Sequence, residues 1–276
     1  MIAAAALRSR VPAPAALLAA LLVLAMTPCA AVTVDVDGRA FEVPAPDGFE
    51  EVASLSRDVR RLAETITPPD NRLLAAFLPD EQVEQVLAGQ APTWRRYMLV
   101  QVERERESVS VSASDFAELK RRLRTQQEAL AARSSVAPED LLRDDDAAAA
   151  DRGATKGIRV DAMLPVGLID EGENHVSIAT LTRYRVHGDS ATRIKVVAAG
   201  TNLLRLDDRL VLAYVYATFA GDADLDWVED TSRRWAAAIV AANRDAAGAA
   251  PALASRQGML LAGAGGAVLV AAIAIW

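Results

Sequence analysis

Cysteine, histidine and aromatic residues are all scarce in this chain. Its 276 residues include one cysteine and two histidines, and aromatic residues make up only 5%. One cysteine cannot form an intrachain disulfide or a thiolate zinc site, which excludes disulfide-stapled scaffolds and zinc fingers. Two histidines leave little room for a histidine metal centre. The hydrophobic fraction is 52%, which is enough to build a folded core.

The charge balance and the missing motifs exclude further classes of protein. The net charge is −7 and the pI is about 5.0, so no excess of positive charge is available for phosphates, and we expect no nucleic-acid partner. The sequence lacks G-x-G-x-x-G and G-x-x-x-x-G-K-[ST], so we expect no nucleotide cofactor. It also lacks G-x-S-x-G, S-x-x-K and H-E-x-x-H. We therefore predict no cofactor and no metal, and no motif assigns a catalytic residue.

The N-terminus has the order of a bacterial export signal. Two arginines precede an apolar run over residues 15–26, and small residues follow. Cleavage after Ala31 would place small residues at the two positions that a signal peptidase reads, so residues 1–31 are predicted to be a signal peptide. Two alternatives remain open, an uncleaved anchor and lipidation of Cys29, although Pro28 before it does not fit a lipidation motif.

The C-terminus carries a second apolar segment. Residues 258–276 are 19 residues without a charge, and a helix of that length measures about 28 Å, close to the hydrocarbon thickness of a bilayer. We predict a transmembrane helix there, joined to the domain by a tether at 244–257. A buried helix is the alternative, although the segment has no polar face. Gly258, Ala262 and Gly266 share one side, which would let two such helices pack as a homodimer unless the spacing is due to chance.

Together these two ends predict a location. The export signal would place residues 32–243 in the periplasm, with the span in the bacterial inner membrane and the lipid bilayer as its partner. Loss of residues 1–31 would leave a net charge of −9 and no cysteine, which suits an oxidising compartment.

Residues 32–243 are predicted to form one α+β domain, a mostly antiparallel β-sheet of about six or seven strands covered by helices. A hairpin is expected over 32–43, where Asp37 and Gly38 supply the turn. Residues 80–89 suggest a short helix or loop, and 133–157 a flexible insertion with a helical turn near Leu141. The other expected strands are 72–78, 94–102 with a continuation through 103–107, 160–166, 175–186, 193–199, 201–206 and 209–219, and the expected helices are 54–66, a long helix from 114 and 225–243.

Three sequence stretches carry a resemblance to a known family. The opening FEVPAPDGFEEV (41–52), the strand RLVLAYVYATF (209–219) and the closing WAAAIVAAN (235–243) resemble the PsbP-like α/β/α sandwich superfamily. That superfamily includes subunits of the oxygen-evolving complex and small bacterial envelope proteins. The resemblance covers about half of the exported part and includes no signature motif. It implies a single-domain scaffold or binding module more than an enzyme, and the insertion at 133–157 departs from it.

Helix 225–243 places Trp227, Thr231, Trp235 and Ile239 at a spacing of four, which predicts one face packed on the core. The acidic start of this helix resembles a calcium loop at Asp222, Asp224 and Asp226. Tryptophan and arginine then occupy the positions where such a loop needs glycine and glutamate. Capping of the helix by Asp224 explains these acids better.

One basic cluster and two histidines are the remaining candidates. Lys120, Arg121 and Arg124 lie on the long helix from 114, where they could contact anionic headgroups or a protein partner. The alternative is an exposed helix face whose charge is offset by neighbouring glutamates. His175 and His187 are 12 residues apart with no metal-ligand spacing, so surface or hairpin positions are expected.

The leading hypothesis from the sequence is a membrane-anchored envelope protein that acts by binding, as an assembly or interaction module without catalysis. Two alternatives stay open. One is an envelope hydrolase with a serine–histidine site assembled in space. The other is a small-ligand module with a cavity between the sheet and its helices.

Overall fold

The computed structural model describes residues 31–132, 137–143, 157–187 and 192–244. The strands are β1 (Ala31–Val36), β2 (Arg39–Pro44), β3 (Phe49–Glu51), β4 (Asn71–Pro79), β5 (Arg96–Glu103), β6 (Gly157–Glu171), β7 (His175–His187), β8 (Thr192–Leu206) and β9 (Arg209–Thr218). The helices are α2 (Arg57–Ile66), α3 (Asp80–Leu87), α4 (Ala113–Ala131) and α5 (Asp222–Ala242), with short 3₁₀ turns η1 (Arg104–Arg106) and η2 (Pro138–Leu142).

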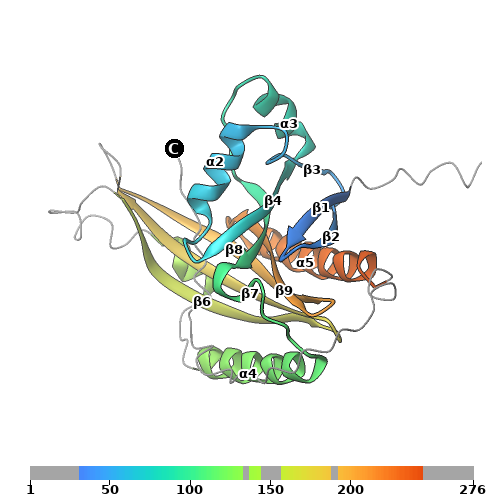
Figure 1. Ribbon diagram of the computed structural model, residues 1–276. Coiled ribbons are helices and arrows are strands. Elements are labelled where there is room, and N and C mark those ends of the chain that lie inside the picture. The colour runs from blue at the N-terminus through green and yellow to red at the C-terminus, as the bar shows by residue number, and fades with distance from the viewer. Residues whose placement is uncertain (1–30, 133–136, 144–156, 188–191, 245–276) are drawn as a thin grey trace, which may run out of the picture.

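Seven strands form one antiparallel sheet in the order β3-β4-β5-β9-β8-β7-β6, and β1 pairs with β2 in a separate hairpin (Figure 1). The prediction of an α+β fold with a mostly antiparallel sheet covered by helices is therefore confirmed. Each expected strand after the hairpin corresponds to a strand of this sheet, although β5 begins at Arg96 instead of residue 94 and β9 ends at Thr218 instead of residue 219. The charged continuation of β5 is discussed below.

Alternating side chains give the sheet two buried faces. On β9, Ala213, Val215 and Ala217 pack with α5 and the β1–β2 hairpin. Tyr214 and Tyr216 point the other way and pack in the cluster that includes α2 and α3. The helix α4 covers the same face as α2, further along the sheet, through Phe116 and Leu119 against β7. Helices therefore cover both faces of the sheet. Successive side chains of a strand point to opposite faces, so both sets of side chains need a cover to be buried.

Local sequence signals set several boundaries of the helices and the hairpin. Asp37 and Gly38 both have positive φ, 53° and 74°, which is the backbone of a tight hairpin turn. The hydroxyl of Ser56 accepts a hydrogen bond from the Val59 amide and so caps α2, which begins three residues later than expected. Of the short helix or loop expected at 80–89, the structure has the helix, α3, over Asp80–Leu87.

Two predictions for strands were wrong. Residues 193–199 and 201–206 are one strand, β8, because Gly200 continues the strand and makes room for α5. A Cβ atom at Gly200 would lie 2.0 Å from the Ser232 Oγ atom of that helix. Residues 103–107 do not continue β5. The chain turns into η1 after Glu103, where the Arg104 amide donates to the Asp70 carbonyl at 2.8 Å.

The long helix α4 begins at Ala113, one residue earlier than expected, and the Ser112 hydroxyl caps it. Its apolar side loses contact with the core toward its end, where Leu130 is 40% exposed. Within the predicted insertion, the helical turn near Leu141 is confirmed as η2, and Leu141 is buried in the core.

The predicted signal peptide (1–31, apart from Ala31), most of the tether 244–257 and the span 258–276 lie outside the described residues, as do residues 144–156 of the insertion. Gly258, Ala262 and Gly266 lie outside them as well. None of the helices within the described residues has the length and apolar character needed to cross a membrane.

Candidate binding site

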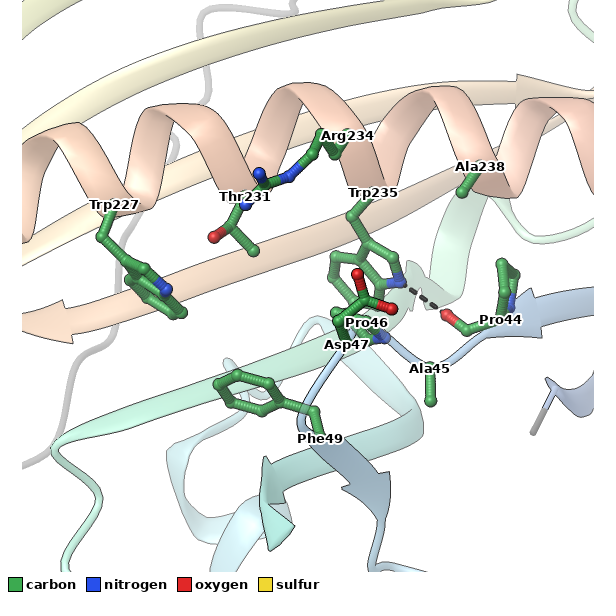
Figure 2. Close-up of a pocket in the computed structure, with 10 residues that line it drawn as sticks. All are labelled: Pro44, Ala45, Pro46, Asp47, Phe49, Trp227, Thr231, Arg234, Trp235 and Ala238. Carbon is green, nitrogen blue, oxygen red and sulfur yellow. Dashed lines mark hydrogen bonds between the residues drawn. The ribbon is translucent and has the colours of Figure 1, made fainter. Parts of the chain in front are cut away.

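An open cavity of about 250 Å³ lies between α5 and the chain that joins β2 to β3. Side chains at a spacing of three or four on α5 form one wall, and the turn from Pro44 to Phe49 forms the other (Figure 2). Its lining residues are Pro44, Ala45, Pro46, Asp47, Phe49, Trp227, Thr231, Arg234, Trp235 and Ala238.

Trp235 is fixed in the inner wall of the cavity. Its Nε1 atom donates a hydrogen bond of 2.8 Å to the Pro44 carbonyl, which joins the two walls across 191 residues of sequence. Its ring meets the edge of Phe77 from the sheet at a centroid distance of 5.5 Å. The indole N–H of Trp235 therefore has a hydrogen-bond partner, and the contact with Phe77 holds its ring in place.

Trp227 is fixed at the other end of the cavity. Its ring stacks with Phe49 at 5.9 Å, and the Arg96 guanidinium lies 4.4 Å from its centroid. Arg96 in turn lies 3.4 Å from a carboxylate oxygen of Asp224. A cation over an aromatic face and a stacked ring both restrict the indole, so the wall is preorganised before any ligand arrives.

Asp224 does not have the capping role that the sequence predicted. The helix begins two residues earlier, at Asp222, with Gly221 in the cap position. The Asp224 carboxylate instead accepts a hydrogen bond of 3.0 Å from the Ala220 amide and pairs with Arg96. Asp224 therefore pairs with the arginine that lies over the Trp227 ring. The described residues contain no cluster of three or more His, Cys, Asp or Glu side chains that could hold a metal ion.

Three polar side chains line the otherwise apolar cavity. Thr231 lies one helical turn from each tryptophan and is buried, while Asp47 and Arg234 are exposed on opposite walls. Neither Asp47 nor Arg234 forms an ion pair with the part of the chain that the structure describes. The cavity thus presents one negative and one positive group beside fixed aromatic surfaces.

The end of α5 is clamped to the hairpin. The Asn243 side chain donates to the Glu42 carbonyl at 2.8 Å and accepts from the Glu42 amide at 2.9 Å. Because Glu42 lies in β2, just before Pro44, this clamp holds the two cavity walls together at one end. The predicted tether begins at the next residue, 244.

Two residues of the predicted basic cluster, Lys120 and Arg124, form contacts within the domain. Lys120 donates to the Gly172 carbonyl at 2.5 Å and lies 3.3 Å from Glu171, and Arg124 also pairs with Glu171. These contacts hold α4 on the end of β6. Hydrogen bonds from Arg124 and Lys120 keep the pKa of the Glu171 carboxyl below its usual value.

Arg121 points away from the sheet on the same helix. Its side chain is 67% exposed and pairs with Glu118, which also accepts a hydrogen bond of 2.8 Å from Arg122. Hydrogen bonds from these two arginines lower the pKa of Glu118. Glu118 therefore offsets the positive charge of Arg121 and Arg122, which is the alternative that the sequence left open. Contact of Lys120, Arg121 and Arg124 with headgroups or a partner stays a prediction.

His175 pairs with an acid that the sequence did not point out. Its Nε2 atom lies 3.0 Å from Asp170 Oδ2 across the β6–β7 turn, and this hydrogen bond lowers the pKa of the Asp170 carboxyl. Within the described chain, no serine hydroxyl hydrogen-bonds to His175. The side chain of His187 lies outside the described residues.

All four tyrosines of the chain gather on the sheet face opposite the cavity. Tyr97, Tyr184, Tyr214 and Tyr216 are buried there. The rings of Tyr97 and Tyr216 stack at 4.7 Å, and burial raises the pKa of both hydroxyls. They form a packed aromatic layer.

Sequence reasoning found one wall of the cavity and missed the other. The spacing of Trp227, Thr231 and Trp235 marked a single helix face, but we interpreted that whole face as core. Pro44 to Phe49 appeared only within the stretch 41–52 that carries the family resemblance, and Arg96 carried no signal. The one hint was the presence of two prolines and an aromatic residue in so short a turn.

No protein-family model and no curated protein matches this chain. Among solved structures, it is similar to a variant of the protein Mog1, with a TM-score of 0.28, 14% identity and coverage of 78% of this chain and 93% of that one. It is similar at the same TM-score and coverage, with 13% identity, to the Ran-binding protein Mog1p of Saccharomyces cerevisiae. Likeness at this level supports no conclusion about fold or function.

Proposed function

We propose that this protein is a single-span protein of the bacterial inner membrane whose periplasmic domain binds a partner and catalyses no reaction. The observation that carries the proposal is the preorganised aromatic cavity on α5. Two fixed tryptophans and a phenylalanine line this cavity in a chain that has few aromatic residues. Trp227 and Phe49 are partly exposed, and Trp235 is buried in the inner wall. Tryptophan at such a site is the residue that most often dominates binding energy.

The position of the cavity agrees with an anchored module. The predicted tether starts at the end of α5, and the Asn243–Glu42 clamp fixes that end to the opposite cavity wall. A partner held in the cavity would thus be held close to the tether and to the predicted span at 258–276. The PsbP-like resemblance, with its expectation of a scaffold or binding module, is part of this proposal.

A photo-crosslinking experiment tests the proposal. A p-benzoylphenylalanine residue replaces Ala238, an exposed cavity residue, in the full-length protein in its bacterial host. A matched protein carries the probe at Arg61, which is exposed on α2 across the sheet. We expect an envelope protein to be crosslinked from position 238 and not from position 61, and the adduct to weaken when residues 258–276 are deleted. Equal labelling from both positions, or none from 238, would contradict a binding role for the cavity.

One observation bears on the hydrolase alternative. The Asp170–His175 pair has the geometry of a base with its orienting acid, but a nucleophile must complete such a site. Purified full-length protein should therefore leave model esters and peptides intact. Turnover that His175→Ala abolished would replace the binding proposal with the hydrolase.

A further inference from the structure

We propose that exposed apolar side chains on β6 and at the end of α4 form a surface that lies on the lipid bilayer beside the predicted span. This β6 surface consists of Leu130, Val160, Met163 and Leu168. The inference rests on the proposed membrane anchor, and it adds the face of the domain that meets the bilayer.

Apolar exposure is concentrated at this edge of the sheet. The four side chains of the β6 surface are between 40% and 51% exposed, and they are four of the seven large apolar side chains that are exposed among the described residues. The strand β6 forms one edge of the sheet, and α4 packs against it (Figure 1). An exposed apolar patch of this kind marks a contact with a membrane or with a protein.

Register shifts bring the three exposed side chains of β6 to one face of the sheet. Val160, Met163 and Leu168 are three and five residues apart, so strict alternation would put Met163 on the face opposite the other two. Two register shifts lie between Val160 and Leu168. As a result, all three pair with even-numbered residues of β7, which face the same side as Val176, the residue that packs with α4. The irregular strand thus gathers its apolar side chains beside α4.

The same irregularity argues against a protein strand as the occupant. A partner strand that extended the sheet, from another protein or from a second copy, would pair with the backbone along the outer edge of β6. Pro165 has no N–H group and lies in the middle of β6, and three register shifts interrupt the strand. Proline and bulges protect sheet edges from such pairing. The β6 surface is therefore suited to contact through side chains, which a fluid bilayer accepts without a matching shape.

The predicted tether would keep this surface next to a bilayer. The helix α5 contacts β6, and the tether at 244–257 follows the end of α5. A chain of that length spans at most about 50 Å, so the span at 258–276 would hold the domain within that distance of the lipid. The effective concentration of the bilayer is then high, and a few apolar side chains are sufficient for a contact.

The charge of α4 is compatible with this contact. The mature chain would carry a net charge of −9, whereas α4 has four basic and three acidic residues and is net positive. Arg121 and Arg122 are both exposed on this helix. Long arginine side chains reach lipid phosphates while apolar neighbours enter the hydrocarbon.

The contact would leave the cavity on α5 open. The strands β3 and β6 are the two edges of the seven-stranded sheet, and the second wall of the cavity is the connection that leads into β3. A domain that lies on the β6 surface would therefore present the cavity to a partner in the periplasm.

Quenching of fluorescence by lipid tests this inference. A single cysteine replaces Met163 or Leu168 in full-length protein that carries Cys29→Ser, and it bears a nitrobenzoxadiazole label. The matched control position is Leu87, which is 64% exposed at the end of α3. The protein is placed in nanodiscs of phosphatidylcholine and phosphatidylglycerol at one copy per disc, so that no second copy covers the surface. We expect emission from 163 and 168 to shift to the blue, and spin-labelled lipids to quench it about threefold more strongly than emission from 87. Equal quenching at the three positions would overturn the inference.

Charged substitutions show whether the apolar side chains carry the contact. With the label at position 130, Met163→Asp combined with Leu168→Asp should abolish the blue shift and the quenching by lipid. The control pair Leu55→Asp and Leu87→Asp, also exposed, should leave both unchanged. Circular dichroism confirms that each variant is folded. Quenching that survives the two substitutions in β6 would contradict the assignment, and a blue shift that appears only with two copies per disc would assign the surface to a second copy instead.

The two proposals can fail separately. An adduct formed from position 238 without quenching at 163 and 168 would leave the binding function standing and remove the bilayer contact. Quenching at 163 and 168 without an adduct would remove the role of the cavity and leave the bilayer contact standing. A protein that does not enter nanodiscs would remove the predicted span and, with it, both proposals.

Discussion

At the scale of single residues, the absence of a side chain at Gly200 decides how closely α5 approaches the sheet. A Cβ atom there would lie 2.0 Å from Ser232 Oγ and 3.1 Å from Val228 Cγ1. Gly200→Ala should destabilise the domain by about 1–3 kcal/mol because the helix must move outward. Urea unfolding followed by circular dichroism measures the change.

A double-mutant cycle checks the cause of that loss. The Ser232 hydroxyl is buried and has no hydrogen-bond partner among the described residues, so Ser232→Ala alone should cost little stability. In the Gly200→Ala background the same substitution removes the closest clash and should recover part of the lost stability. Additive effects of the two substitutions would show that helix approach is not the reason.

At the scale of elements, the attachment of α4 to the β6–β7 turn depends on two carboxylates. Glu171 pairs with Lys120 and Arg124, and Asp170 pairs with His175. Both carboxyl pKa values are lowered in the folded state, chiefly by these hydrogen bonds. A depressed pKa stabilises the folded state above the unfolded-state value, and this stability is lost as the pH falls through the folded-state pKa.

The domain should therefore become less stable below about pH 4.3, the usual pKa of a glutamate. Glu171→Gln should be less stable near neutral pH and should lose less stability on acidification, because it has no charge to lose. The urea midpoint measured between neutral and acidic pH tests this, with Glu64→Gln on α2 as a control for an exposed carboxylate. An equal acid dependence in Glu171→Gln and the wild type would contradict the assignment.

At the scale of the whole molecule, both ends of the domain leave it beside the cavity. Ala31 pairs with Pro44 in the hairpin, and Glu42, two residues earlier, holds Asn243 at the end of α5. Segments that lead to a membrane from either end would therefore start from the same edge of the domain. The cavity lies at that edge, where a membrane-associated partner would meet it.

Deletion of residues 258–276 tests the predicted anchor. We expect the truncated protein to move from the membrane fraction to the soluble periplasmic fraction, because the span would no longer hold it. N-terminal sequencing of the released protein should find a chain that begins at Val32. Continued membrane association with an intact leader would show instead that residues 1–31 act as the uncleaved anchor.

Most of the fold could be predicted from local patterns. Alternation in β9 and the helical spacing in α2 and α5 require only neighbouring residues, and the Asp37-Gly38 turn is set by its own backbone. The errors arose where a local signal had a distant cause. Gly200 suggested a break between strands, but its small size serves the packing of Ser232 on another element.

The α+β class and the face of α5 that carries Trp227, Thr231 and Trp235 could be predicted from the sequence, because periodicity is a property of the chain itself. That part of this face forms a cavity wall depends on the folded arrangement. The opposite wall, Pro44 to Phe49, is joined to Trp235 across 191 residues of sequence. Periodicity shows which side chains share a face, but it carries no information about which distant segment covers that face or how much of it stays open.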